Sequence, residues 1–473
     1  MSSARFSASP VTSISVVSID AVLPESLAGW LTAQRWYANK TAPPRFERIG
    51  GWRVDHNDVS FVTHYLLDHV PAADGTARSV LYQVPLAERT YPLPDVEPIG
   101  TISTDAGEKV VYDATADPEY AAMILRIMLT EQSDSDFAGH RQPGAPSVEV
   151  TSAGVLRGEQ SNTSIICQVA QGNPVIVKVF RALHHGENPD VVLQSVIAAA
   201  GSDLVPASVG SITGSWSDTG RADGIAVGHL AFAQEFLPGV EDAWRVALRA
   251  AEAGEDFTER AHALGVATAE VHAVLAAALP TNTPSESDIS AILASMESRL
   301  EAAVAEVPSL DAWRAPVESI FNAARSAPWP ALQRIHGDYH LGQVLAVPER
   351  GWVLLDFEGE PMRLMAERSE PDVTLRDVAG MLRSFDYVAG SVLLREGTDS
   401  AAGWAAAARE AFVDGYIERS GINLREHRAL LDAFEVDKAL YEAVYEARNR
   451  PGWLEIPTTA IHRLAEDTRA DLS

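Results

Sequence analysis

The stretch RIHGDYHLGQVLAVPERGWVLLDFEGEP, residues 334–361, carries the pattern that decides the fold. Its first part places His336, Asp338 and His340 at every second position, so in an extended chain their side chains share one face. Its second part holds two apolar runs joined by Pro-Glu-Arg-Gly, which predicts a β-hairpin over residues 343–357. Histidines and carboxylates set around a hairpin are typical of a site for a metal ion or for a phosphate group.

A metal site built by the protein alone is the first interpretation of this stretch. His336, Asp338 and His340 offer the nitrogen and oxygen ligands that zinc accepts, and a zinc-dependent hydrolase is the function that would follow. However, three ligands on one strand leave the fourth coordination position without a ligand, whereas structural zinc sites are closed. The alternative is that the two histidines form hydrogen bonds with the backbone and orient the loop.

A phosphate site explains more of these residues. Phosphoryl transfer uses a carboxylate to receive the proton of the acceptor hydroxyl and oxygen ligands to hold Mg²⁺ against the phosphates. In protein kinases the base Asp is followed five positions later by an amide ligand and, beyond a hairpin, by a second Asp. The same spacing predicts Asp338 as the catalytic base and Gln343 and Asp356 as magnesium ligands. Glu358 and Glu360 fit either a supporting role at the metal or solvent exposure.

A nucleotide site also needs a cation for the phosphates, and the apolar strand pattern VIVKVF at residues 175–180 supplies Lys178. A lysine in so apolar a strand favours an anionic partner, as does the strand lysine of protein kinases. The helix expected after residue 188 offers Asp190, and Glu187 lies just before it, so the identity of the partner stays open. The alternative is a lysine that extends from an edge strand into solvent.

Two further segments are candidates for contact with ATP. Residues 158–164, GEQSNTS, join two expected strands and are rich in small hydrogen-bond donors, although ordinary hairpin turns have the same composition. Residues 234–237, QEFL, end the last expected strand, where the backbone would meet an adenine edge or simply connect two lobes. The candidate ATP contacts in these segments are Ser161, Asn162, Thr163, Gln234, Glu235 and Leu237.

The composition is that of a globular protein with more than one domain. The 473 residues exceed one ordinary core, and 46% of them are hydrophobic. The formal charge of −28 makes nucleic acid and anionic membrane surfaces unfavourable partners. Cys167 is the only cysteine, so no intrachain disulfide is expected. Because we find neither a signal-peptide pattern nor an uninterrupted apolar run of membrane-spanning length, we expect a cytoplasmic protein.

The order of the sequence patterns divides the chain into three parts. Residues 1–100 combine an amphipathic helix with alternating strands, as in a small α+β unit. Residues 101–237 contain a helix at 118–129, a loop-like stretch at 131–147 and then mainly strands. Residues 238–473 are helical and rich in alanine, apart from the hairpin. We therefore predict an α+β, bilobal protein in which a strand-rich half precedes a helical half.

The helix expected at residues 429–450 has a polar face that suits a sugar, which offers many hydroxyl groups and an apolar ring face. The residues of this face recur at spacings of four, three and four; they are Lys438, Glu442, Tyr445 and Asn449, with Arg448 beside them. The alternative is a solvated helix surface with a Lys438–Glu442 ion pair, which would contribute only a few tenths of a kcal/mol.

Five segments of the chain resemble the actinobacterial maltokinases, which are kinases of the aminoglycoside-phosphotransferase-like type. The segments are QRWYANK at 34–40, HGDYHLGQVL at 336–345, LDFEGEP at 355–361, LRDVAGMLRSFDY at 375–387 and DKALYEAVYEARNRPGWLEIP at 437–457. The resemblance spans nearly the whole chain. The last segment discriminates best, because the patterns at 336–345 and 355–361 occur more broadly.

This resemblance implies a protein-kinase-like fold with an N-terminal α+β cap subdomain, a strand-rich N-lobe for the nucleotide and a helical C-lobe. It implies transfer of the γ-phosphate of ATP, with Mg²⁺, to the anomeric hydroxyl of maltose, giving maltose 1-phosphate for α-glucan synthesis. It adds Arg376 and Asp377 to the sugar site. Trehalose synthase, a source of maltose, is the protein partner that the family suggests. The alternatives are a related glucosamine or aminoglycoside kinase and a catalytically silent pseudokinase.

Overall fold

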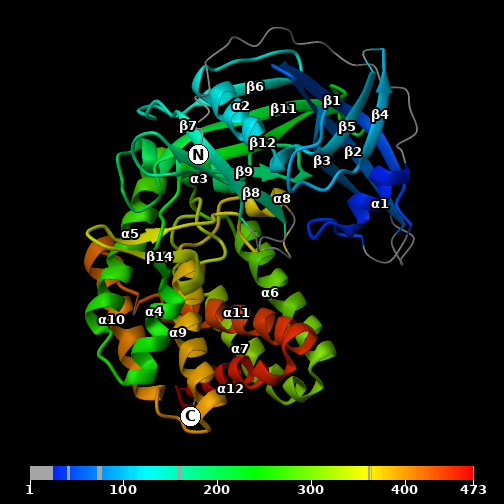
Figure 1. Ribbon diagram of the computed structural model, residues 1–473. Helices are drawn as coiled ribbons and strands as arrows, with labels where there is room; N and C mark the ends of the chain where they lie inside the picture. The colour runs from blue at the N-terminus through cyan, green and yellow to red at the C-terminus, as the bar shows by residue number, and fades with distance from the viewer. Residues whose placement is uncertain are drawn as a thin grey trace. The chain divides into compact units, whose positions relative to one another are not determined.

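The computed structural model describes residues 25–39, 43–71, 77–105, 107–156, 161–360, 363, 365–424 and 426–471. The chain folds into two compact units, each drawn in Figure 1. Unit 1 comprises Met1–Ser195 and Pro206–Pro238, and unit 2 comprises Val196–Val205 and Gly239–Ser473. The long strands belong to unit 1 and most of the helices belong to unit 2.

The first sheet of unit 1 is antiparallel and has the strand order β1-β2-β3-β5-β4, with β10 paired to β3. The bounds of these strands are β1 (Phe46–His56), β2 (Val59–Pro71), β3 (Ala77–Arg89), β4 (Gly100–Thr104), β5 (Gly107–Asp113) and β10 (Ala182–Leu183). Leu27 and Leu31 of helix α1 (Glu25–Ala33) pack in a core with Leu66 of β2 and Tyr82 of β3. This part of unit 1 combines a helix with antiparallel strands, and two of the strands, β5 and β10, lie beyond residue 100.

The second sheet of unit 1 is also antiparallel, with the order β6-β11-β12-β9-β8-β7. Its strands are β6 (Phe137–Arg141), β7 (Val150–Val155), β8 (Asn162–Val169), β9 (Val175–Phe180), β11 (Ser208–Ser217) and β12 (Ile225–Glu235). Helix α2 (Pro118–Leu129) precedes these strands in the chain, and helix α3 (Pro189–Ala199) lies between β9 and β11. The prediction of a loop at 131–147 is wrong in part, because residues 137–141 form β6 and pair with β11.

The two sheets of unit 1 are joined by buried polar side chains. The Gln83 side-chain amide on β3 donates hydrogen bonds to the Phe180 carbonyl at 2.8 Å and to the Leu230 carbonyl at 2.9 Å. The fully buried Arg181 donates to Asp113 at 2.7 Å and to Thr163 at 2.8 Å. Because buried polar groups need such partners, these contacts fix the N-terminal sheet against the sheet that carries Lys178.

Unit 2 combines a short antiparallel sheet with helices. Its strands, in the order β13-β14-β15, are β13 (Glu241–Asp242), β14 (Val344–Val347) and β15 (Gly351–Leu354). Its helices are α4 (Ala243–Ala253), α5 (Thr258–Ala278), α6 (Glu286–Glu306), α7 (Arg314–Arg325), α8 (Met365–Arg368), α9 (Leu375–Glu396), α10 (Ala402–Ser420), α11 (Arg428–Asn449) and α12 (Glu455–Asp471).

The predicted hairpin is confirmed as β14 and β15. Val344 pairs with Leu354 and Val347 pairs with Gly351, whose φ of 80° lies in the left-handed region that glycine adopts readily. The second strand ends at Leu354, three residues earlier than predicted, so Asp356 lies in a loop. The Leu354 amide donates to the Leu204 carbonyl at 2.7 Å, which attaches the hairpin to the segment Val196–Val205 of unit 2.

Helix α5 is the described helix that is long and apolar enough to cross a membrane by length and composition. Half of its apolar window is buried inside the structure, and α5 packs against α10. A Cβ atom on Gly265 would lie 2.1 Å from the Phe412 carbonyl oxygen, and one on Gly415 would lie 2.1 Å from that of His262. The two helices therefore approach so closely that only glycine fits, and this packing accounts for the apolar sequence of α5.

Candidate active site

Hydrogen bonds to Asp377, near the start of α9, hold the loop of residues 335–340 in place. The Asp377 carboxylate accepts hydrogen bonds from the His336 amide at 2.8 Å, the Gly337 amide at 2.9 Å and the His272 ring at 2.9 Å. Burial alone would raise the pKa of Asp377, but the hydrogen bond from His272 and its neighbours lower it. Asp377 therefore fixes the loop, and the structure does not place it in the cavity where a sugar contact was expected.

The two histidines of the loop bind the backbone. The His336 ring donates from Nε2 to the Leu355 carbonyl at 2.8 Å, and its Nδ1 accepts a longer bond of 3.4 Å from the Asp338 amide. The His340 Nδ1 accepts from the Gly342 amide at 3.0 Å. Among the described residues these side chains do not converge with Asp338 on a common ion position. The geometry thus favours the orienting role over the zinc site.

Asp338 reaches a cavity of about 410 Å³ in unit 2, where it meets Lys438 of α11. The Lys438 ammonium donates to the Asp338 carboxylate at 2.9 Å and to the Glu360 carboxylate at 2.9 Å. Burial opposes ionisation of all three groups. The opposite charges outweigh the effect of burial. As a result the pKa of Lys438 is raised, the pKa of Asp338 is lowered and the pKa of Glu360 is lowered to about 2. All three groups are therefore charged at neutral pH.

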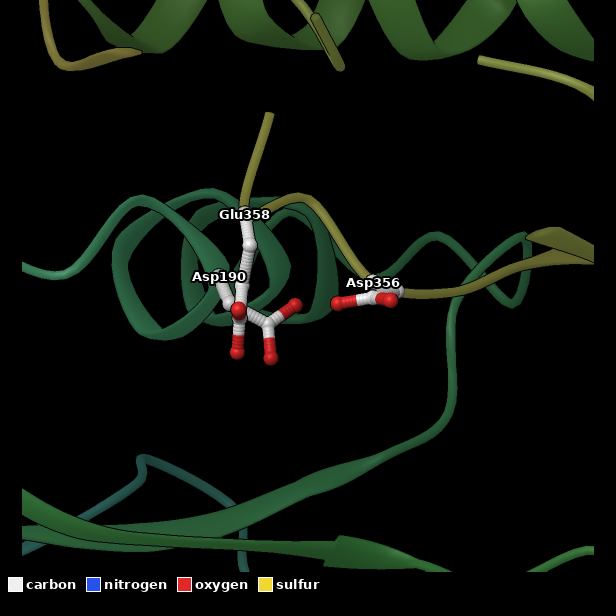
Figure 2. A group of neighbouring side chains, drawn as sticks. All are labelled: Asp190, Asp356 and Glu358. Atoms are coloured by element: carbon white, nitrogen blue, oxygen red, sulfur yellow. The ribbon is translucent and has the colours of Figure 1, made fainter. Parts of the chain in front are cut away.

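The two predicted metal ligands lie together beyond the loop. The Gln343 side-chain amide donates to the Asp356 carboxylate at 3.0 Å. Asp356 has a φ of 60°, a strained value for a residue with a side chain and one that occurs often at functional sites. Figure 2 shows Asp356 and Glu358 two positions apart on the loop that follows β15. Carboxylate oxygens and an amide that can rotate its carbonyl inward form a donor set that suits Mg²⁺.

In unit 1, Lys178 pairs with Asp190 at 2.8 Å, which answers the question that the sequence left open. Asp190 lies in the first turn of α3 and is drawn in Figure 2. Its second carboxylate oxygen accepts from Gln194 at 2.6 Å, and its backbone amide donates to Asn188 at 2.9 Å. The buried carboxylate is therefore held rigidly, and it fixes the lysine on β9.

The other predicted nucleotide residues also lie in unit 1, near the start of β8 and near the end of β12. Residues 157–160 fall outside the described residues, whereas Ser161 is exposed and Asn162 begins β8. Thr163 is buried and accepts a hydrogen bond from Arg181 at 2.8 Å.

The segment of residues 234–237 begins with the last two residues of β12, a central strand of the second sheet. The Glu235 carboxylate accepts from the Asn173 side chain at 2.6 Å, and the Glu235 amide donates to the Ala207 carbonyl at 2.8 Å. The Gln234 side-chain oxygen is buried and has no hydrogen-bond partner among the described residues. Leu237 comes directly before Pro238, where the chain leaves unit 1. An unsatisfied buried oxygen is the feature here that points to a ligand donor.

The cavity beside Asp338 is lined by α4, α9, α11 and the chain after α11, all in unit 2. Three of the predicted sugar residues, Lys438, Glu442 and Tyr445, line it. The lining also contains Tyr441, which flanks the predicted polar face of α11, and three aromatic residues that were not predicted as sugar contacts: Trp244, Tyr387 and Trp453. Tyr387 and Trp453 lie inside the family-like segments and could have been found there, whereas Trp244 lies in no recognised segment.

Besides Asp377, three predicted sugar residues lie outside the residues that line this cavity. Arg376 is buried and pairs with Asp372 at 2.7 Å and with Asp437 at 3.0 Å. Arg448 pairs with Glu306 at 2.7 Å on the surface. The Asn449 side chain donates to the Tyr445 carbonyl at 2.8 Å. Helical spacing placed Arg448 and Asn449 near the polar face, and the family resemblance added Arg376. Neither signal reveals the acids that pair with the two arginines or the backbone carbonyl that binds Asn449.

The far end of the cavity is aromatic and its charges are paired. Tyr387 and Trp453 stack with their ring centroids 6.4 Å apart, and the Arg450 guanidinium lies 4.7 Å from the centroid of Trp453. Glu446 accepts from Tyr387 at 3.1 Å and from Arg450 at 2.9 Å. Such stacked rings with a few fixed polar groups are typical of a small-molecule pocket.

The fold and this site define a phosphotransferase. The chain belongs to the phosphotransferase enzyme family, whose profile matches residues 155–430, and residues 30–117 match the maltokinase N-terminal cap domain. The predicted α+β fold, with a cap, a strand-rich part and a helical C-terminal part, is thereby confirmed, and so is the resemblance to that group of kinases.

The chain is similar to two curated proteins and to one solved structure, all of them glucosamine kinases. The glucosamine kinase of Streptacidiphilus jiangxiensis is 28% identical over 381 residues, covering 76% of this chain and 83% of the relative. A glucosamine kinase of Mycolicibacterium smegmatis is 27% identical over 328 residues, covering 65% and 78%. A structure of glucosamine kinase in complex with glucosamine, ADP and inorganic phosphate has a TM-score of 0.65 at 22% identity, covering 94% of this chain and 100% of that one. The chain therefore shares their fold.

Proposed function

We propose that the protein is an ATP-dependent kinase that phosphorylates maltose at its anomeric hydroxyl and releases maltose 1-phosphate and ADP. The observation that carries the proposal is the cavity that begins at Asp338 and ends at the stacked rings of Tyr387 and Trp453. The match of residues 30–117 to a maltokinase cap supports the same substrate.

The length of the cavity favours a disaccharide. Lys438, next to Asp338, and Tyr445 are seven residues apart on α11, which corresponds to about 10 Å along the helix. A single pyranose ring that places its anomeric hydroxyl at Asp338 would leave the end near Trp453 unfilled. A second ring would reach this end and stack on the aromatic side chains.

The charges of the cavity favour a neutral sugar over glucosamine. The ammonium of glucosamine requires a carboxylate, but Glu442 accepts two hydrogen bonds from Arg383, at 3.0 and 2.8 Å. Glu446 is paired with Arg450. Because Glu442 and Glu446 already have guanidinium partners and Asp338 is paired with Lys438, an added cation gains little. Glucosamine remains the second candidate because the curated relatives named above are glucosamine kinases.

The predicted base, phosphate lysine, nucleotide segments and metal ligands each have a defined part in this proposal. Asp338 accepts the proton of the anomeric hydroxyl while the sugar oxygen bonds to the γ-phosphorus and ADP leaves. Lys178, fixed by Asp190, binds the phosphates of ATP, and the segments of residues 161–163 and 234–237 contact the rest of the nucleotide. Mg²⁺, held by Gln343 and Asp356, would neutralise charge on the phosphates. The enzyme would act in the cytoplasm and supply α-glucan synthesis, with trehalose synthase as a candidate partner.

The decisive experiment is a substrate panel. The protein is incubated with Mg-ATP and maltose, glucosamine, glucose or kanamycin, and each product is identified by mass spectrometry and ³¹P NMR. We expect maltose 1-phosphate, recognised by its phosphate on the anomeric carbon, and a loss of about 10²-fold or more in the Asp338→Asn variant. Faster phosphorylation of glucosamine than of maltose would replace the proposal by the second candidate.

A further inference from the structure

The carboxylate proposed as the base is already occupied by a cation. The Lys438 ammonium lies 2.9 Å from Oδ1 of Asp338, and both groups line the same cavity. A general base has to come within hydrogen-bond reach of the proton that it accepts, which is a similar distance. Lys438 therefore takes up one of the two positions on Asp338 that an incoming hydroxyl group or water molecule would use.

Lys438 has a second partner that stays in place when it leaves Asp338. Its ammonium also donates to Oε1 of Glu360 at 2.9 Å, and it lies 4.9 Å from the ring centroid of Tyr441. Glu360 is 1% exposed and is held from its other side by Arg299 at 3.4 Å. Since a buried cation must keep a partner, this second carboxylate allows Lys438 to move without losing its ion pair.

The contact weakens Asp338 as a base. The positive charge of Lys438 lowers the pKa of the Asp338 carboxyl, although burial works in the opposite direction. A carboxylate with low proton affinity is a poor acceptor for the proton of a water molecule in the cavity. A bound sugar is different, because its hydroxyl groups can replace the Lys438 contact while the rest of the sugar binds along α11.

Building on the maltose kinase function proposed above, we infer that Lys438 and Glu360 form a latch that keeps Asp338 from promoting ATP hydrolysis until the sugar is bound. In the sugar-free protein Lys438 bridges Asp338 and Glu360. When the sugar binds, its anomeric hydroxyl takes the place of Lys438 at Asp338, and Lys438 remains with Glu360. Both latch residues are positioning residues, because they act through Asp338.

The latch selects between two reactions that differ only in the nucleophile. In each, an oxygen–phosphorus bond forms to the γ-phosphorus, the bond to the bridging oxygen breaks, and ADP leaves with the electron pair. The nucleophile's proton passes to Asp338. With the sugar the product is maltose 1-phosphate, whereas with water it is inorganic phosphate. An enzyme with such a latch therefore forms little ADP in the absence of sugar.

The test uses two variants that should act in opposite directions. Lys438→Met removes the latch, so we expect sugar-independent ADP formation to rise about tenfold while the yield of sugar phosphate per ADP falls. Glu360→Gln removes the second carboxylate partner of Lys438, so that the Lys438 ammonium should stay paired with Asp338. We therefore expect sugar-free ADP formation to stay at or below the wild-type rate and kcat with maltose to fall. A purely structural role would not separate the two variants in this way.

The control is Arg428→Gln, which removes an exposed ion pair with Asp432 on the same helix and should leave both rates unchanged. Lys438→Gln provides the same test if Lys438→Met does not fold. Sugar-free ADP formation at or below the wild-type rate in the Lys438 variants, with only a higher KM for maltose, would overturn the latch and leave Lys438 as a sugar contact. Failure of the wild-type protein to phosphorylate any sugar would instead overturn the proposed function.

Discussion

Single buried carboxylates hold the groups that act in the candidate site. Asp377, Glu360 and Asp190 are each 1% exposed, and they bind the loop backbone, Lys438 and Lys178, respectively. The spacing of Asp338, Gln343 and Asp356 could be recognised in the sequence because their order follows the chemistry of phosphoryl transfer. The supporting role of Asp377 could not, since its partners are two backbone amides about forty residues away and the His272 ring, which is 105 residues away along the chain.

Asp377→Asn should slow the reaction without removing substrate binding. The amide would turn a donor toward a backbone N–H, so the loop of residues 335–340 would lose a hydrogen bond and Asp338 would shift. A misplacement of about 1 Å costs about 10²-fold in rate. Steady-state kinetics should show kcat lowered by this order, with KM for ATP little changed. Asp311→Asn, which affects an exposed pair with Arg314, is the control; equal kcat values in the two variants would contradict the role.

Glu360 should make the stability of the protein depend on acid pH. Its pKa is lowered from 4.5 to about 2, so its ion pairs stabilise the fold fully above pH 4.5 and this contribution is lost as the pH falls through 2. Urea unfolding of the wild type and of Glu360→Gln should therefore give a difference in free energy of unfolding that is largest at pH 6 and shrinks by pH 3. A difference that does not change with pH would show that Glu360 is not ionised in the fold.

The secondary-structure elements divide into those with a local signal and those without one. The hairpin β14–β15 and helix α2 follow from their turn and capping residues, Gly351 in the turn and Asp117 at the helix start. Strand β6 was missed because residues 131–147 are rich in turn-forming residues, and pairing with β11 is what makes residues 137–141 extended. Pairing between strands distant in the chain leaves no pattern within the short strand itself.

The contact between α5 and α10 should be sensitive to a single methyl group. Gly265→Ala places a Cβ atom 2.1 Å from the Phe412 carbonyl oxygen, so the helices must separate. Overpacking of this kind costs about 1–3 kcal/mol, more than the gain in helix propensity. Denaturant unfolding should detect the loss. Gly403→Ala on α10, which has no atom within 4 Å of the new Cβ, should be neutral or slightly stabilising. Equal stabilities would mean that the helices have room.

At the scale of the whole molecule, the two units contribute different chemistry. Unit 1 holds the predicted nucleotide residues, and unit 2 holds Asp338, the two predicted metal ligands and the cavity beside Asp338. The sequence patterns indicated this division between a strand-rich and a helical half. The substrate was harder to infer, because the aromatic end of the cavity is assembled from α4, α9 and the chain beyond α11.

The net charge should affect the binding of the two proposed substrates, MgATP and maltose, differently. A chain with a formal charge of −28 repels the anionic MgATP complex, whereas maltose is neutral. Raising the ionic strength from 0.05 to 0.3 M should therefore lower KM for MgATP by about twofold and leave KM for maltose unchanged. Kinetics at matched magnesium concentration provide the measurement. A parallel change in both KM values would point to a general effect of salt on the protein.

The polar contacts of Gln83 have a consequence for any attempt to make a smaller version of the enzyme. The Gln83 side chain lies in the N-terminal sheet, yet it satisfies the carbonyl groups of Phe180 and Leu230 in the neighbouring sheet, and β10 has its pairing partner in β3. A version that begins at residue 155, where the phosphotransferase match starts, would leave these carbonyls without their hydrogen bonds and would expose the edge of a strand. Exposed strand edges promote aggregation. The cap is thus part of the folding unit, and tags or fusion partners should not be inserted between the cap and the rest of unit 1.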